Sequence, residues 1–159
     1  MPAMFYLSQR DPKWAGVRIG ATRLTVANWG CVATSISMLS SYGGFYLTPA
    51  QIARAPGQFN ALGEIIWMQL AKTFKGRMTF QRRIGSKKFW KRDDAAIKKS
   101  ILGGPKLVCL LQVNNGKHWV VATGIAGNDY WCADPIDGKK KLVLKAYPNI
   151  TGSCHLILT

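Results

Sequence analysis

Residues 28–42 read NWGCVATSISMLSSY, and Gly43 and Gly44 follow directly. Apolar residues recur in this stretch at the spacing of a helix, and a pair of glycines is a common helix terminator. The pattern therefore predicts a helix that begins at Cys31 and ends near Tyr42. It places a cysteine in the first turn, directly after a small residue.

A cysteine in that position has a chemical advantage. The N-terminus of a helix presents free N–H groups and partial positive charge, which favour a thiolate over a thiol. The same N–H groups can hold the oxyanion that forms when a thiolate attacks a carbonyl. A side chain at Gly30 would block a substrate lying against the sulfur of Cys31. The alternative is a cysteine that merely packs at the start of a helix.

A cysteine nucleophile needs a base, and imidazole is the usual one. The chain has only two histidines, and His118 opens a predicted strand while His155 lies in an apolar C-terminal one. We expect His118 to be the base and His155 to be structural. An imidazole needs an acceptor that fixes its tautomer. Asp134, at the end of the neighbouring predicted strand, is the first candidate, and Asp137, in a turn before a glycine, is the second.

The other three cysteines, Cys109, Cys132 and Cys154, form no CxxC pair and have no metal-ligand spacing. We expect reduced thiols and no metal site. Cys109 and Cys154 fit the pattern of small buried hydrophobes. Cys132 lies two residues before Asp134 and could be a rival thiol, although a strand offers it no helix dipole.

Helices precede strands along the chain. The patterns predict helices at residues 31–42, 48–52, 60–76 and 93–103, and strands at residues 107–113, 118–123, 130–134, 141–145 and 155–158. The turns between the strands are short, as in antiparallel sheets. This order predicts an α+β domain with N-terminal helices packed on a C-terminal antiparallel sheet.

The chain has 159 residues, of which 48% are hydrophobic, and a mass of 17.6 kDa. These values suit one domain over residues 1–159 and exclude a disordered chain. No run approaches the roughly 20 apolar residues of a membrane span. Residues 1–5 lack the features of a signal peptide, so we expect synthesis in the cytoplasm without one. We also expect a monomer.

Charge is strongly unbalanced, with 22 Lys and Arg against seven Asp and Glu, a formal net charge of +15. Such an excess indicates a polyanionic partner. Half of the basic residues lie between residues 72 and 99, a segment that matches no nucleic-acid-binding motif. We expect it to contact an anionic surface, whether cell wall, lipopolysaccharide or nucleic acid. The residues proposed for this contact are Lys72, Lys75, Arg77, Arg82, Arg83, Lys87, Lys88, Lys91 and Arg92.

Several short motifs together resemble the C39-like, papain-like cysteine peptidases. They are QRDPKW at residues 9–14, WGC at 29–31, TP at 48–49, HWVV at 118–121 and YWCADP at 130–135, in the order of that family. The matches span most of the chain, and the ordered set is more specific than any one motif. The basic segment has no counterpart in the family's general pattern.

The resemblance implies a papain-like fold and a role for each of four residues. Cys31 would be the nucleophile, His118 the general base and then acid, and Asp134 the residue that orients it. Gln9 would lend its side-chain amide to an oxyanion hole beside the backbone N–H of Cys31. Such a peptidase forms a thioester acyl-enzyme and needs no metal or cofactor.

Three functions remain open. A peptidoglycan endopeptidase of the endolysin type, acting on the bacterial wall after release, fits a small and strongly basic hydrolase. A second possibility is a peptidase that processes a leader or another protein. A third, of another class, is a nucleic-acid-binding module on a degenerate peptidase fold.

Overall fold

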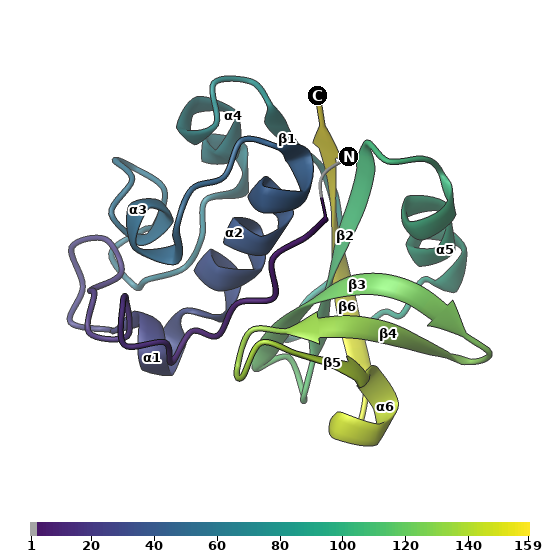
Figure 1. Cartoon of the computed structure of the whole chain (residues 1–159). Coiled ribbons are helices and arrows are strands. Elements are labelled where there is room, and N and C mark those ends of the chain that lie inside the picture. Colours follow the sequence, from purple (N-terminus) through teal and green to yellow (C-terminus); the bar gives the residue numbers. More distant parts are fainter. Residues whose placement is uncertain (1–2) are drawn as a thin grey trace.

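The computed structural model describes residues 3–159. Residues 1 and 2, part of the N-terminal stretch in which we found no features of a signal peptide, lie outside the described residues. Its centre is a six-stranded antiparallel sheet with the strand order β1-β6-β2-β3-β4-β5 (Figure 1). The strands are β1 (Met78–Gly85), β2 (Leu107–Val113), β3 (His118–Ala126), β4 (Asp129–Asp134), β5 (Lys139–Leu142) and β6 (Ile150–Leu158).

Helices cover the sheet on both faces. They are α1 (Val26–Trp29), α2 (Cys31–Gly43), α3 (Pro49–Ala53), α4 (Leu70–Thr73), α5 (Asp94–Leu102) and α6 (Val143–Ala146), with a 3₁₀ turn at Trp67–Gln69. In Figure 1 helices α1 to α4 form a group on one side of the sheet, and α5 lies on the other. None of the helices in the described part of the chain combines the length and apolar character that a membrane crossing requires.

Two apolar clusters lie on opposite faces of the sheet, because neighbouring residues of a strand point to opposite faces. Trp119 and Val121 of β3 pack with Ile36 and Leu39 of α2 in the first cluster. The second lies toward α5 and contains Val120 of β3, together with residues such as Ile97, Cys109, Cys132 and Tyr130. This arrangement confirms the predicted α+β class, with helices packed on an antiparallel sheet.

Most predicted helices are confirmed, together with their termini. Helix α2 begins at Cys31, and Gly44 ends it in the left-handed conformation at φ +83°. Thr48 caps α3 through a reciprocal capping box with Gln51, and Asp93 caps α5 by accepting from the N–H of Ala96. These ends depend on local side-chain chemistry, which the sequence displays directly.

The helix predicted over residues 60–76 is wrong. Asn60 does not cap a helix; its side-chain oxygen accepts from the N–H groups of Leu62 and Glu64 and closes a loop. Gly63 has a φ of +80° in that loop, and Phe59 bridges to Ile65 across it. A 3₁₀ turn at Trp67–Gln69 and the short helix α4 form at the end of the segment. Local hydrogen bonds of Asn compete with a helix, and here they prevail.

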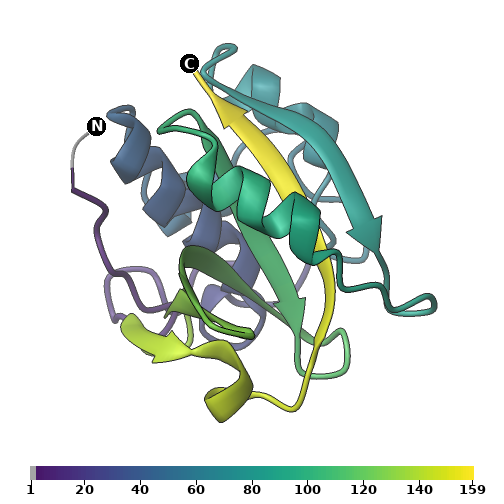
Figure 2. The ribbon, with the colours of Figure 1, turned by 90° about the vertical axis from the view of Figure 1, so that its right-hand side faces the viewer.

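Two other predictions need correction. Strand β1 was not predicted, because its exposed residues include Arg82 and Arg83 and its sequence resembles the rest of the basic segment. The strand predicted at residues 141–145 instead occupies Lys139–Leu142 and passes into α6. Figure 2 shows β1 running into a projecting loop before α5, which crosses the outer face of the sheet.

Candidate functional site

Cys31 is the first residue of α2 and follows α1 after the single residue Gly30. The intrahelical pattern begins where the N–H of Thr34 donates to the carbonyl of Gly30 at 2.9 Å. The N–H groups of the residues before it therefore have no acceptor within this helix. Gly30 also has a packing role at this junction. A Cβ there would lie 2.4 Å from the carbonyl oxygen of Val26, so a side chain would break the junction itself.

His118 begins β3 and Asp134 ends β4. Because the two strands are antiparallel neighbours, both residues lie at the same end of the pair. Nε2 of His118 lies 2.8 Å from Oδ1 of Asp134, and both residues are buried. Since Asp134 engages Nε2, Nδ1 is the ring nitrogen left for the thiol of Cys31. The structure thus brings together His118 and Asp134, which are 16 positions apart in sequence, and Cys31, 87 positions before His118, interacts with the same imidazole.

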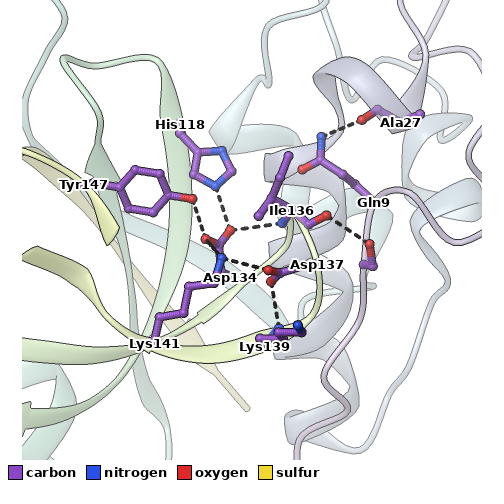
Figure 3. A network of polar contacts seen from close by, with 10 residues as sticks. Gln9, Ala27, His118, Asp134, Ile136, Asp137, Lys139, Lys141 and Tyr147 are labelled. Carbon is purple, nitrogen blue, oxygen red and sulfur yellow. Dashed lines mark hydrogen bonds and ion pairs between the residues drawn. The ribbon is translucent and has the colours of Figure 1, made fainter. Parts of the chain in front are cut away.

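The carboxylate of Asp134 is fully buried and held from several directions (Figure 3). Besides His118, it accepts from the N–H of Ile136 at 3.0 Å, from Nζ of Lys141 at 2.9 Å and from the hydroxyl of Tyr147. Asp137, the other candidate for orienting the imidazole, is exposed and pairs with Lys141 at 2.9 Å. It is therefore Asp134 that accepts from His118.

These contacts shift the ionisation of both partners. Burial would lower the pKa of His118, but hydrogen bonds and charge interactions with Asp134 and Cys31 raise it to about 9. Burial would raise the pKa of Asp134, but its hydrogen bonds hold that pKa far below the ordinary value. Near neutral pH the site therefore favours an imidazolium against a carboxylate.

Gln9 is buried beside this group and is fixed at its main chain and its side chain. Its backbone N–H donates to the carbonyl of Pro135 at 2.6 Å, directly after Asp134. Its Nε2 donates to the carbonyl of Ala27 in α1 at 2.9 Å. Each amide nitrogen has two N–H groups, so one is free of that contact. Figure 3 shows Gln9 between the α1 segment and the loop after β4.

The N-terminal QRDPKW motif folds into a turn that positions Gln9. The carbonyl of Asp11 accepts from the N–H of Trp14, and the buried indole of Trp14 donates to the carbonyl of Ser8 at 2.7 Å. On the other side, Gly138 packs against Leu7 and Ser8 so closely that a Cβ would lie 3.0 Å from the carbonyl carbon of Leu7. The motif is therefore structural as well as spatially close to the candidate site.

The other thiols lie in the core. Cys109, Cys132 and Cys154 are buried, and all four cysteines are unpaired among the described residues. Burial raises the pKa of Cys132 to about 12, and it also holds the pKa of Cys109 and of Cys154 well above the ordinary value of a thiol. Cys31 is the one partly exposed thiol in residues 3–159. Over the same range, His, Cys, Asp and Glu side chains form no group of three or more suited to a metal ion.

Sequence reasoning missed Tyr147 and Lys141 as parts of the site. Tyr147 follows α6, and its ring centroid lies 5.2 Å from that of His118. Lys141 reaches Asp134 from the adjacent strand β5. Only the pairing of β4 with β5 could have pointed to Lys141, and no sequence signal marks Tyr147.

The predicted basic residues are spread over helix α4, strand β1 and the connecting segment that follows each of them. Lys72 lies in α4, Arg82 and Arg83 in β1, and Lys87, Lys88, Lys91 and Arg92 in the loop to α5, while Lys75 and Arg77 occupy the turn before β1. In the described structure, two of them make hydrogen bonds or ion pairs through their side chains. Arg77 donates to the carbonyl of Thr159, and Arg92 pairs with Asp94 at 2.8 Å.

Solved structures include one of the same architecture. The chain superimposes on a double glycine motif protease from an AMS/PCAT transporter, solved in complex with a leader peptide, with a TM-score of 0.52. The fold is that of the papain-like cysteine peptidases. The match covers 92% of this chain and 94% of that one at 18% identity. No protein-family profile matches the chain, and neither does any curated protein sequence.

In this papain-like fold the two halves of the molecule contribute different parts of the site. The helical half supplies the cysteine at a helix N-terminus, and the sheet supplies the imidazole and the carboxylate. Their arrangement can support attack of a thiolate on a carbonyl, followed by proton transfer from an imidazolium.

Proposed function

We propose that the protein is a cysteine peptidase in which Cys31 is the nucleophile. The observation that carries the proposal is the position of His118, held at 2.8 Å by the fully buried Asp134 and interacting with Cys31. A histidine with a merely structural role has no need of both an oriented carboxylate and a thiol at a helix N-terminus.

The first step forms a thioester. The thiolate sulfur of Cys31, paired with the imidazolium of His118, attacks a peptide or isopeptide carbonyl carbon. The resulting oxyanion accepts hydrogen bonds from the backbone N–H of Cys31 and from the amide of Gln9. The intermediate collapses as the carbon–nitrogen bond breaks, and the imidazolium gives its proton to the leaving amine.

The second step returns the enzyme. His118, now neutral, takes a proton from water as the water oxygen attacks the thioester carbonyl. The carbon–sulfur bond breaks, the acid product leaves, and Cys31 regains its ion pair with His118. Asp134 remains a carboxylate throughout and keeps Nε2 protonated, so that Nδ1 performs both transfers.

The similar solved structure is a protease that binds a leader peptide, which supports a peptide substrate here. The net charge of +15 supports a finer proposal, hydrolysis of peptides in the anionic bacterial wall by an endolysin-type enzyme. Processing of a protein is the alternative peptidase function. A nucleic-acid-binding module with an idle cysteine would share the charge but would make no use of the ordered ion pair.

The direct test is labelling and activity of a matched pair of variants. Iodoacetamide should modify Cys31 first in the native protein, and Cys31→Ala should reduce hydrolysis by at least about 10³-fold. Cys109→Ala, which removes a buried thiol, should leave hydrolysis unchanged. An active Cys31→Ala protein would exclude the mechanism.

Assays with two substrates distinguish wall hydrolysis from protein processing. New free amines in purified sacculi would support wall hydrolysis, whereas fragments of a casein substrate with intact sacculi would support protein processing. Steeply salt-dependent binding of DNA by a protein whose Cys31 does not react with iodoacetamide would favour the binding module instead.

A further inference from the structure

A groove of about 510 Å³ is lined by residues that are sequence neighbours of Cys31 and of His118. Trp29 and Val32 border it, two positions before and one after Cys31. Trp119, which follows His118, borders it as well. The groove therefore lies beside the candidate nucleophile, where it is placed to receive a peptide on one side of the scissile bond.

The floor of the groove is apolar. Trp67 and Trp119 meet edge to face with their ring centroids 5.5 Å apart, and Phe59 and Ile65 also line it. Aromatic rings in this arrangement offer a broad surface to an aliphatic or aromatic side chain. The groove is therefore suited to at least one apolar residue of a bound chain.

Its rim is basic. Arg83 of β1 and Lys87 and Lys88 of the following loop line the groove, and all three are exposed. The guanidinium of Arg83 lies over the ring of Trp119, 5.2 Å from the centroid. Glu64 is the single acid among the lining residues, and Asn60 holds it at 3.2 Å. The positive charge of the rim thus exceeds the negative charge.

The loop that carries the two lysines is fixed against the sheet. Gly85 has a φ of +76°, and a Cβ there would lie 2.5 Å from the carbonyl oxygen of Thr151. Ser86 accepts from the N–H groups of Lys88 and Phe89 at 3.2 and 3.0 Å. The stem of Lys87 packs over Gly116, where a Cβ would lie 3.0 Å from its Cγ.

That last contact links the loop to the site, because Gly116 belongs to the turn that precedes His118. The basic rim is therefore positioned by the same β2–β3 hairpin that positions the imidazole. A preorganised charge next to a reacting centre contributes more to selection than a distant one, because little ordering is needed on binding.

We propose that this groove is a specificity subsite for an acidic peptide, in which an apolar residue fills the aromatic floor and neighbouring Asp or Glu carboxylates meet Arg83, Lys87 and Lys88. The inference rests on the proposed peptidase function and names its substrate class. It gives part of the basic segment a role in substrate selection, beyond general attraction to anionic surfaces.

Binding can be measured apart from cleavage with the Cys31→Ala variant. The probe is a fluorescein-labelled octapeptide of alternating Glu and Leu, compared by anisotropy with one of alternating Gln and Leu. The acidic probe should bind more tightly, and Lys87→Gln with Lys88→Gln should weaken its binding about three- to tenfold. The neutral probe should be unaffected.

The matched control is Lys98→Gln with Lys99→Gln. It removes the same charge from the exposed face of α5, which packs on the opposite side of the sheet. Equal loss of binding in the two double variants, or equal binding of the two probes, would overturn the subsite. Tighter binding of a single-stranded thymidine dodecamer than of the acidic probe would overturn it too, by assigning the rim to nucleic acid.

Cleavage is then measured with internally quenched peptide mixtures that carry Glu at one fixed position or Gln at the same position. The active protein should give a higher kcat/KM for the Glu mixture, and the Lys87→Gln, Lys88→Gln variant should lose that preference. Selective binding without cleavage by the wild-type protein would leave the subsite standing and refute the peptidase function. Cleavage without any preference would do the reverse.

Discussion

At the scale of single residues, the proposed mechanism makes the pH dependence of activity a property of the His118–Asp134 pair. His118 must be protonated to release the leaving amine, and its pKa of about 9 depends on its interactions with Asp134 and Cys31. We expect kcat/KM to fall on the alkaline side with an apparent pKa near 9. In Asp134→Asn this limb should shift to lower pH, because a negative charge that favours the imidazolium is lost.

The same variant should lose about 10²- to 10⁴-fold in activity, because the tautomer and orientation of the imidazole are no longer fixed. Asp137→Asn is the matched control, since Asp137 is exposed and has no contact with His118 in the described structure. A pH profile of Asp134→Asn identical to that of the wild type would show that another group sets the limb.

The environment of His155 predicts that the folded state loses stability at acidic pH. Its ring is buried between the hydroxyls of Ser100 and Ser153, at 2.7 and 2.8 Å, which together match one donor and one acceptor of a neutral imidazole. Burial and the charge of Arg82 lower its pKa, while Asp93 opposes them. Below about pH 6.5 the unfolded chain therefore binds a proton that the folded chain resists.

The free energy of unfolding should consequently fall as the pH decreases from about 6.5, by up to about 1.4 kcal/mol per unit from this group. Urea titrations of His155→Gln should show a smaller fall than the wild type. His118→Gln should not, because a raised pKa stabilises the folded state at low pH. An unchanged slope in His155→Gln would contradict this account of the buried ring.

Much of the candidate site can be predicted from the sequence because titratable residues are scarce. Two histidines and seven acids leave few combinations, and Cys31 is the one cysteine that begins a predicted helix directly after a glycine. Tyr147 and Lys141 could not be predicted, since both reach Asp134 only after β5 and α6 have packed against β4. Burial of a carboxylate is a property of the fold and leaves no mark on the local pattern.

At the scale of elements, the junction of α1 and α2 fixes the sulfur in place. We expect Gly30→Ala to destabilise the protein by about 1–3 kcal/mol, because the new Cβ would lie 2.4 Å from the carbonyl oxygen of Val26. Displacing Cys31 by about 1 Å should lower activity by about 10²-fold. Thermal unfolding and kcat/KM measure the two effects.

Gly16→Ala provides the control, because nothing in the described structure lies within 4 Å of a Cβ at that position. It should change the free energy of unfolding by less than about 0.5 kcal/mol. If Gly30→Ala behaved like Gly16→Ala, the close approach of α1 would have no part in positioning the cysteine.

Helices with clear terminal signals could be predicted from the sequence, and helices without them could not. Thr48, Asp93 and Gly44 mark helix ends by local chemistry, so α2, α3 and α5 are found where expected. The segment 60–76 has helical spacing of apolar residues, but Asn60 closes a loop there. Strand β1 is recognisable only through its pairing with β6, a long-range contact.

At the scale of the whole molecule, charge repulsion should oppose folding. The net charge is +15, so folding brings like charges close together and they repel one another. Salt screens this repulsion, with a Debye length of about 10 Å at 0.1 M. We expect Tm to rise between about 0.05 and 0.5 M NaCl. Lys98→Gln with Lys99→Gln should show a smaller rise, and a Tm that decreases with salt would refute the effect.

The order of strands also has a consequence for how the protein is made. Strand β6 lies between β1 and β2 although it is translated after both, and Gln9 is anchored to Pro135 although 126 residues separate them. While a ribosome is still producing the chain, β1 and β2 have no partner between them and Gln9 has no anchor. A candidate site of this design stays unassembled until most of the chain has been made, so Cys31 has no oriented partner on a nascent chain.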